Sequence, residues 1–177
     1  MRISSARKFT PLGVGVAALA LVLTACSGGG ATGGDGGEVG VTDDTIYLAA
    51  SQTLSGPGAA SCAPSTDAAK LYFDKVNADG GIDGRMIDFE VLDDAYDPQR
   101  ALANARGFLD KKFAMVGACG SATAAALYKT LSSAGMPFLF PTNGVAEVVK
   151  PASPGIFQIL PLYEDQTAAL VNYGFEQ

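Results

Sequence analysis

Hydrophobic residues between positions 45 and 177 follow two alternating patterns. Short apolar runs predict β-strands, and the longer segments between them, in which apolar residues recur every three or four positions, predict α-helices. The predicted strands cover residues 46–50, 86–92, 113–118, 136–140 and 156–160, and the predicted helices cover residues 64–79, 98–109, 124–134 and 163–173. Strands that alternate with helices in this way indicate an α/β fold with a parallel sheet and helices on both faces.

Local signals mark the ends of several of these elements. Pro64 suits the first turn of the first helix, which Gly80 ends, and Asp97 followed by Pro98 is typical of a capped helix start. In the strand at 86–92, apolar and acidic residues alternate, which is the pattern expected near the edge of a sheet.

The expected ligand site follows from the sheet. An open parallel sheet binds ligands beyond the carboxyl ends of its strands, where the strand order reverses. If the order is the flavodoxin-like 2-1-3-4-5, the reversal lies between the first and third strands, and the loops there are residues 52–62 and 119–123. Both loops contain hydroxyl groups and glycines, and both lead into a helix N-terminus, which favours negative charge. We expect a pocket for a small polar group at this edge.

The N-terminal residues have a different pattern. Three basic residues precede an uncharged apolar stretch at 11–23, which is too short to span a membrane. The following sequence, Leu-Thr-Ala-Cys at 23–26, resembles the bacterial lipobox, so residues 1–25 are predicted to be a lipoprotein signal peptide and Cys26 the lipidated first residue of the mature chain. A plain signal peptide with a chance cysteine is the alternative. The glycine-rich residues 26–44 are predicted to be a flexible linker, with the protein exported and held on the outer face of the cell membrane.

Two cysteines follow the lipobox. In the 2-1-3-4-5 order, Cys62 and Cys119 lie in neighbouring loops, and an exported protein meets an oxidising environment. A disulfide between them is therefore predicted, with two separate buried thiols as the alternative.

Composition narrows the chemistry. The predicted mature chain has nine basic and eighteen acidic residues, which argues against binding to nucleic acid. The sequence has no histidine, which excludes imidazole metal sites and Ser-His catalytic triads. An extracellular enzyme with Ser121 or Cys119 as its nucleophile is the weakest alternative, because it would lack a histidine base. Asp93, Asp94 and Asp97 fall short of a calcium loop, so we predict neither a metal nor a cofactor.

Several segments resemble the amino-terminal lobe of the branched-chain amino acid type of solute-binding protein, which has a type I periplasmic-binding fold and serves ABC importers. They are N-x-x-G-G-I-x-G-R at 77–85, DDAYDP at 93–98, and the predicted strand with Pro141 that follows Gly135. The resemblance runs from about residue 46 to residue 177. It implies a protein that delivers a small polar ligand, such as an amino acid, an amide or a small organic acid, to an ABC permease.

The resemblance also implies a set of ligand contacts from three loops of this lobe. The expected ligand-binding residues are Leu54, Ser55, Gly56, Tyr96, Gly120, Ser121, Thr123, Thr142 and Asn143. Ser121 and Thr123 would offer hydroxyl and N–H groups to a carboxylate or an amide. The amino-acid binders of the family have threonine where this chain has Gly144, and a cysteine that pairs with the Cys119 position where this chain has Tyr96. The ligand class therefore stays open.

The resemblance divides the chain into a ligand-binding lobe at 45–160 and the start of a second lobe at 161–177. Family members trap ligand by closing two lobes, so we expect residues 27–177 alone to bind ligand weakly or not at all. A ligand-sensing ectodomain of the same fold and a truncated remnant without function are the alternatives.

Overall fold

The computed structural model describes residues 37–177, so the predicted signal peptide and Cys26 lie outside the described residues. The described part of the predicted linker 26–44 is hydrogen-bonded to residues of the first strand: the Tyr47 N–H donates to the Gly40 carbonyl at 2.8 Å. Val41 forms an antiparallel bridge with Ile46. The last residues before the first strand are therefore attached to the sheet.

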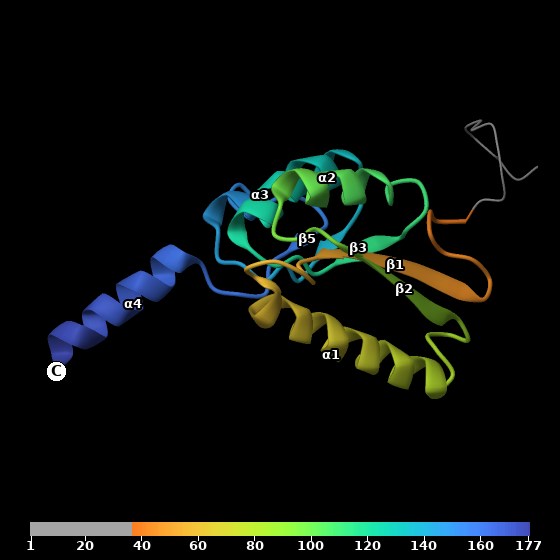
Figure 1. The fold of residues 1–177 in the computed structure, drawn as a ribbon, viewed down its shortest axis with the longest axis horizontal. Helices are drawn as coiled ribbons and strands as arrows, with labels where there is room; N and C mark the ends of the chain where they lie inside the picture. Colours follow the sequence, from red (N-terminus) through yellow and green to blue (C-terminus); the bar gives the residue numbers. More distant parts are fainter. Residues whose placement is uncertain (1–36) are drawn as a thin grey trace, which may run out of the picture. The chain divides into compact units, whose positions relative to one another are not determined.

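A five-stranded parallel sheet forms the centre of the lobe (Figure 1). The two long strands, β1 and β2, pair in register from Thr45 opposite Met86 to Gln52 opposite Asp93. The strand order is β2-β1-β3-β4-β5, which confirms the flavodoxin-like order and places β2 at an edge. The strands are β1 (Thr45–Gln52), β2 (Met86–Asp93), β3 (Ala114–Val116), β4 (Phe138–Leu139) and β5 (Ile156–Phe157).

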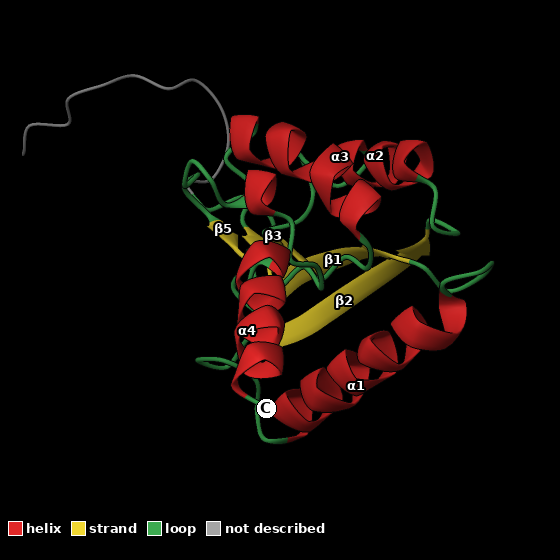
Figure 2. Cartoon of the chain, turned by 90° about the vertical axis from the view of Figure 1, so that its left-hand side faces the viewer, coloured by secondary structure: helices red, strands yellow, loops and turns green. Residues whose placement is uncertain are grey.

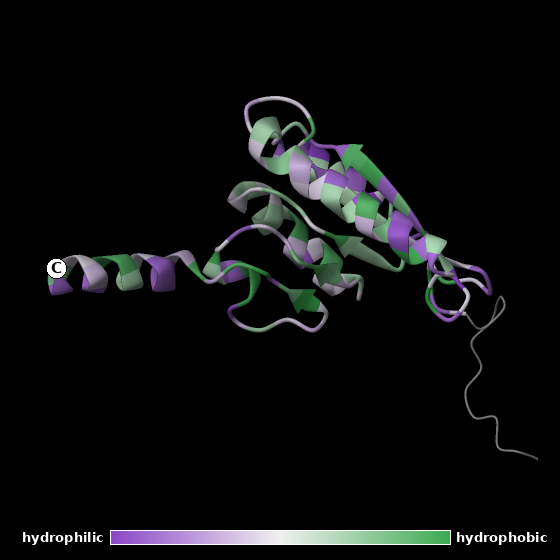
Figure 3. Cartoon of the chain, turned by 90° about the horizontal axis from the view of Figure 1, so that it is seen from below, coloured by the Kyte–Doolittle hydropathy of each residue, from purple (hydrophilic) through white to green (hydrophobic). Residues whose placement is uncertain are grey.

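Helices lie on both faces of this sheet, as expected (Figure 2). One face packs against α1 (Ala59–Ala78), and the other packs against α2 (Pro98–Arg106) and α3 (Ser121–Ser133). A short 3₁₀ helix, η1 (Ala146–Val148), follows β4 and was not expected from the sequence. The last helix, α4 (Tyr163–Glu176), extends away from the sheet with no buried residue (Figures 1 and 3). None of the helices in the described residues is both long and apolar enough to cross a bilayer.

Small side chains bring α2 and α3 close to the sheet. Ala101 and Ala105 on α2 and Ala124 on α3 are fully buried, so the larger side chains of Met115 and Leu127 fill the space between the layers. On the opposite face, Phe73 of α1 packs edge-on against Phe89 of β2, with ring centroids 5.0 Å apart. Each face of the sheet thus has its own apolar core.

Two helix starts differ from the sequence prediction. α1 begins at Ala59 rather than Pro64, and α3 begins at Ser121 rather than at residue 124. An internal proline removes one helical hydrogen bond, and α1 tolerates Pro64 near its start, where the disulfide at Cys62 also anchors it. The predicted cap of α2 is confirmed, because the Asp97 carboxylate accepts the Gln99 N–H at 2.7 Å.

Candidate functional site

The loops that follow β1, β3 and β4 meet at the carboxyl edge of the sheet, where the sequence predicts the ligand site. Cys119 and Thr142 form a parallel bridge beyond the ends of β3 and β4, and the Thr142 N–H donates to the Ala118 carbonyl at 2.8 Å. The loop after β2 joins them, because the Asp94 N–H donates to the Gln52 carbonyl at the end of β1. The backbone thereby collects the predicted residues at one edge.

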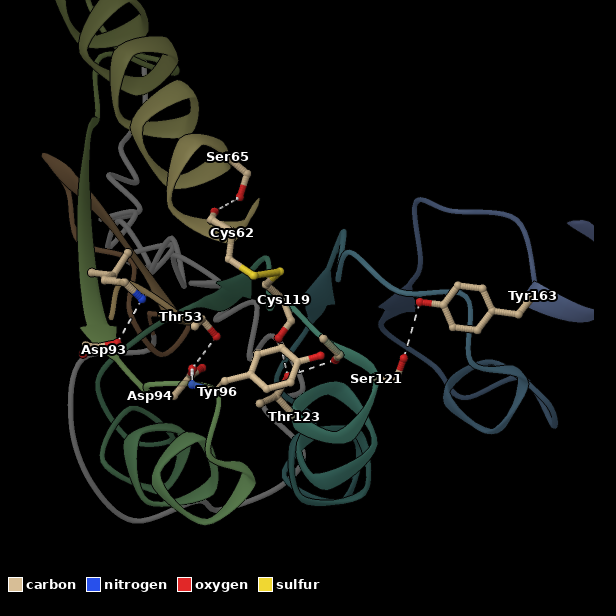
Figure 4. Close-up of a disulfide and its surroundings, with 12 residues drawn as sticks. Thr53, Cys62, Ser65, Asp93, Asp94, Tyr96, Cys119, Ser121, Thr123 and Tyr163 are labelled. Atoms are coloured by element: carbon tan, nitrogen blue, oxygen red, sulfur yellow. Dashed lines mark hydrogen bonds between the residues drawn. A yellow bond between two sulfur atoms is a disulfide. The ribbon is translucent and has the colours of Figure 1, made fainter. Parts of the chain in front are cut away.

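The side chain of Asp94 connects the end of β1 with the loop that follows β2. Its carboxylate is fully buried and accepts hydrogen bonds from the Ser51 hydroxyl at 3.0 Å, the Thr53 hydroxyl at 2.7 Å and the Tyr96 N–H at 2.9 Å (Figure 4). Buried carboxylates are stabilised only when their oxygens are satisfied in this way. Asp94 therefore fixes the end of β1 and the backbone of Tyr96.

Asp93 holds the loop after β1. It accepts hydrogen bonds from the Leu54 N–H at 2.9 Å and from both the N–H and the hydroxyl of Ser55. The Ser55 hydroxyl, followed by the Ala95 N–H, lowers the pKa of the Asp93 carboxyl from its usual value of 3.8 to about 2. Leu54 and Ser55, two of the predicted ligand-binding residues, are exposed but tied to this carboxylate. Among the described residues, no group of three or more potential metal ligands occurs.

Tyr96 lies over two glycines. Its φ of +66° is unusual for an aromatic residue, and the ring extends across α3's N-terminal end, with 45% of the residue exposed (Figure 4). A Cβ atom at Gly58 would lie 2.8 Å from a ring carbon, and one at Gly120 would lie 2.6 Å from another. The ring can occupy this place only because both positions lack a side chain.

The first turn of α3 presents Ser121 but not Thr123. The Ser121 hydroxyl lies 3.4 Å from the Tyr163 hydroxyl, whereas Thr123 is buried and its hydroxyl donates to the carbonyls of Cys119 and Gly120. The Thr123 hydroxyl is thus committed to the loop, which differs from the expectation that it faces the ligand. The first N–H groups of a helix have no acceptor within it, so this end of α3 favours an anion.

In the loop after β4, likewise, one predicted ligand-binding residue is exposed and the other is buried. Thr142 is exposed, whereas Asn143 is fully buried and its side-chain oxygen accepts the Val145 N–H at 3.0 Å. Next to it, Gly144 lies directly under Tyr163: the Tyr163 N–H donates to the Gly144 carbonyl at 2.8 Å, and a Cβ at 144 would lie 2.6 Å from the ring.

The disulfide predicted between Cys62 and Cys119 is present in the structure, with Cα atoms 5.7 Å apart (Figure 4). Cys62 lies in the first turns of α1 and is 2% exposed, and Cys119 lies two residues before the start of α3. The covalent bond therefore connects two of the helix starts that face the site.

A pocket of about 220 Å³ lies between α1 and the ends of the central strands. Of the nine predicted ligand-binding residues, only Thr142 lines it, together with Phe89, Phe140 and Ile159. Two buried acceptors in its wall, the side-chain oxygens of Gln52 and Thr66, have no hydrogen-bond partner. The other predicted residues that reach the surface lie on the open edge outside this pocket.

Sequence reasoning missed two residues that shape this edge. Asp94 was considered only as part of an acidic cluster, although a carboxylate directly after a strand at a sheet edge is a signal for loop organisation. Tyr163 is the first residue of the predicted helix 163–173, and nothing in its local pattern shows that it covers Gly144.

Comparisons with a family model, with the sequences of known proteins and with solved structures agree with one another. Residues 45–177 match the family model described as periplasmic binding protein. A leucine-, isoleucine-, valine-, threonine-, and alanine-binding protein of Pseudomonas aeruginosa is 27% identical over 147 residues, which is 73% of this chain and 39% of that protein. Among solved structures, a fatty acid ABC transporter substrate-binding protein from Thermomonospora curvata matches 77% of this chain and 34% of its own, with a TM-score of 0.72 and 29% identity.

A putative branched-chain amino acid ABC transporter structure from Rhodospirillum rubrum matches 73% of this chain and 39% of its own, with a TM-score of 0.61 and 26% identity. The chain therefore spans less than two fifths of the length of each of these three relatives.

An open parallel sheet of this order brings three loops and a helix N-terminus together at its carboxyl edge, where sheets of this kind bind ligands. The chain belongs to the periplasmic binding protein family, and its described part has the type I fold of that family. The family is one of ABC-transporter solute-binding proteins and not of enzymes, which confirms the non-enzymatic expectation at the level of the family.

Proposed function

We propose that the full-length protein is an extracytoplasmic solute-binding lipoprotein that delivers a small polar ligand with a carboxylate or amide group to an ABC importer. The observation that carries the proposal is the convergence of the three loops on the first turn of α3, where Ser121 is partly exposed. Free helix N–H groups beside a hydroxyl are suited to an oxyanion or an amide oxygen.

The names of the relatives support this ligand class. One relative is named for binding five amino acids, and another is named as a fatty acid transporter protein. Amino acids and fatty acids share a carboxylate, which is the group that the end of α3 favours. We therefore propose that the carboxylate is the part of the ligand that this lobe binds.

Binding to the full-length natural protein tests the proposal. Calorimetry with amino acids, amides, short-chain carboxylates and neutral sugars should show binding of carboxylates or amides and none of sugars. Ser121→Ala should weaken binding of the best ligand by about 1 to 3 kcal/mol, because a ligand oxygen loses its donor. Ser133→Ala, at the other end of α3 and exposed, is the matched control and should bind as the natural protein does. Binding unaltered by Ser121→Ala would place the site elsewhere.

Membrane attachment is a separate part of the proposal, and it rests on the lipobox-like residues 23–26. Cys26→Ser should move the protein from the membrane fraction of the producing cell to the soluble fraction, because the lipidated thiol is lost. Cys62→Ser, which removes a cysteine of the disulfide instead, should leave the protein in the membrane fraction. If the Cys26→Ser protein stays with the membrane, it is held there by something other than a lipid at this residue.

A further inference from the structure

The free edge of strand β2 carries an inference about self-association, and this inference does not depend on the ligand. We infer that the side chain of Asn77 closes this edge: it takes the hydrogen-bonding place of a neighbouring strand and so keeps β2 from pairing with the β2 strand of a second copy of the chain. Asn77 is the first residue of the segment N-x-x-G-G-I-x-G-R, which the candidate site does not use.

Strand β2 has a backbone surface that suits such pairing. It lies at the edge of the parallel sheet and, with eight residues, is as long as β1. The Met86 and Asp94 N–H groups donate to carbonyls directly before and at the end of β1. By the alternation of a strand ladder, the backbone groups of Ile87, Phe89 and Val91 point to the free edge. An exposed row of such groups is a template for pairing with another chain.

Asn77 occupies one position on this edge with both groups of its amide. Its side-chain nitrogen donates to the Ile87 carbonyl at 2.9 Å, and its side-chain oxygen accepts the Ile87 N–H at 2.7 Å. An antiparallel strand would make the same two bonds with this residue. Asn77 lies in the last turn of α1, which packs beside β2 (Figure 1). At the other end of β2, the Arg100 and Asn104 side chains donate to the Asp93 carbonyl.

The rest of this segment brings Asn77 opposite Ile87. After α1 ends, Ile82 and Arg85 exchange two backbone hydrogen bonds, at 2.8 and 2.9 Å, which turn the chain directly into β2. Gly81 has a φ of +76°, and a Cβ atom there would overlap the Arg85 carbonyl. The tight turn therefore places a helix residue beside a strand residue only ten positions away.

The effect on pairing follows from symmetry. Two copies of one edge strand related by a two-fold axis run antiparallel, and a pair centred on Phe89 places Ile87 of each copy opposite Val91 of the other. Each of these three residue pairs would exchange two backbone hydrogen bonds. With Asn77 bound to Ile87, both outer pairs are blocked and only the central pair is left. The association of two molecules costs more free energy than one such pair supplies.

Charge acts in the same direction but less strongly. In the register centred on Phe89, Asp88 lies opposite Glu90 of the other copy, and both side chains are exposed. Like charges directly opposite one another disfavour pairing. Lys112 offsets the charge of Glu90 through an ion pair at 2.7 Å. The amide of Asn77 is therefore the main obstacle to pairing.

Asn77→Ala in the full-length natural protein tests the inference. Sedimentation velocity should show that Asn77→Ala, unlike the natural protein, forms a species of twice the mass as the protein concentration rises. The variant should associate about tenfold more tightly or better, a difference of about 1.4 kcal/mol, because four backbone hydrogen bonds become available between the two copies. An Asn77→Ala protein with the same mass as the natural protein at every concentration overturns the inference.

Two further variants separate the open edge from a loosened end of α1. Lys75→Ala removes the ion pair with Asp79 at this helix end and leaves the edge untouched, so it should not associate. Asn77→Asp can accept the Ile87 N–H but cannot donate to the carbonyl, and it adds a negative charge to the edge, so it should not associate either. Association of either variant to the same extent as Asn77→Ala would show that the helix end, and not the edge, is the cause.

Amide hydrogen exchange followed by NMR locates the contact and does not depend on a variant that folds. In the natural protein, the Ile87 amide should exchange about tenfold more slowly than those of Phe89 and Val91, because its N–H has the Asn77 oxygen as acceptor and theirs face the free edge. In the Asn77→Ala dimer, all three amides should be protected. Equal protection of the three in the natural protein would show that another part of the molecule covers the edge, and a dimer with Phe89 and Val91 unprotected would be joined elsewhere; either result overturns the inference.

Discussion

Removal of the Cys62–Cys119 disulfide should strongly destabilise the lobe. The bond joins residues separated by 57 positions, and the chain-entropy relation for a loop of that size gives about 4 kcal/mol at 25 °C. The double variant Cys62→Ala/Cys119→Ala removes the bond without leaving a free thiol. With a typical urea dependence of about 2 kcal/mol per molar, the unfolding midpoint should fall by about 2 M.

Urea unfolding followed by far-ultraviolet circular dichroism measures this shift in the full-length natural protein. The natural protein treated with reductant should unfold at the same midpoint as the double variant, which separates the effect of the bond from that of the alanines. A thiol titration of denatured Cys62→Ser should find one more free thiol than the natural protein has. Coincident midpoints for the oxidised protein and the double variant, or an unchanged thiol count, would refute the reasoning.

Three further predictions concern other residues. Stability should fall as the pH drops from about 4 towards 2, because the Asp93 pKa is lowered from 3.8 to about 2 and its contribution is complete only above the higher value; Asp93→Asn should flatten this part of an acid-unfolding curve. Asp94→Ala should lower the free energy of unfolding by about 2 to 5 kcal/mol, measured in urea, because it leaves two hydroxyls and one N–H of the buried loop unpaired. Leu127→Ala should cost about 2 to 5 kcal/mol in the same assay, since Leu127 is fully buried between α3 and the sheet; a loss below 1 kcal/mol would show that the core collapses around the cavity.

Most of the fold follows from residue patterns. The alternation at 86–92 indicated an edge strand, and β2 is at the edge: its inner face contains the buried Ile87, and Asp88 and Glu90 of its outer face are exposed. The apolar runs at 136–140 and 156–160 overestimated β4 and β5, which have two residues each. An apolar run does not by itself set the length of a strand: Phe140, Ile159 and Leu160 lie in loops beyond the hydrogen-bonded pairs and are exposed.

The site was predicted less completely than the fold. Sequence reasoning predicted the disulfide, and the place of the loop 119–123 at the carboxyl edge, because both follow from strand order and loop position. It could not show that Thr123 and Asn143 turn inward, since that depends on which backbone groups of the loops need partners. Tyr163 was missed because its contact with Gly144 joins two segments distant in the chain, and no local periodicity records such a contact.

The place of the Tyr96 ring over Gly58 has a consequence for how this site can change by mutation. A methyl group at position 58 would come 2.8 Å from the ring, so Gly58→Ala alone should be harmful, while the same change should be accepted when residue 96 is small. The two positions are epistatic: the size of the effect of one substitution depends on the residue at the other position. A library that varies single positions would classify Gly58 as invariant, and only paired variation would reveal the alternative binding surfaces open to this lobe.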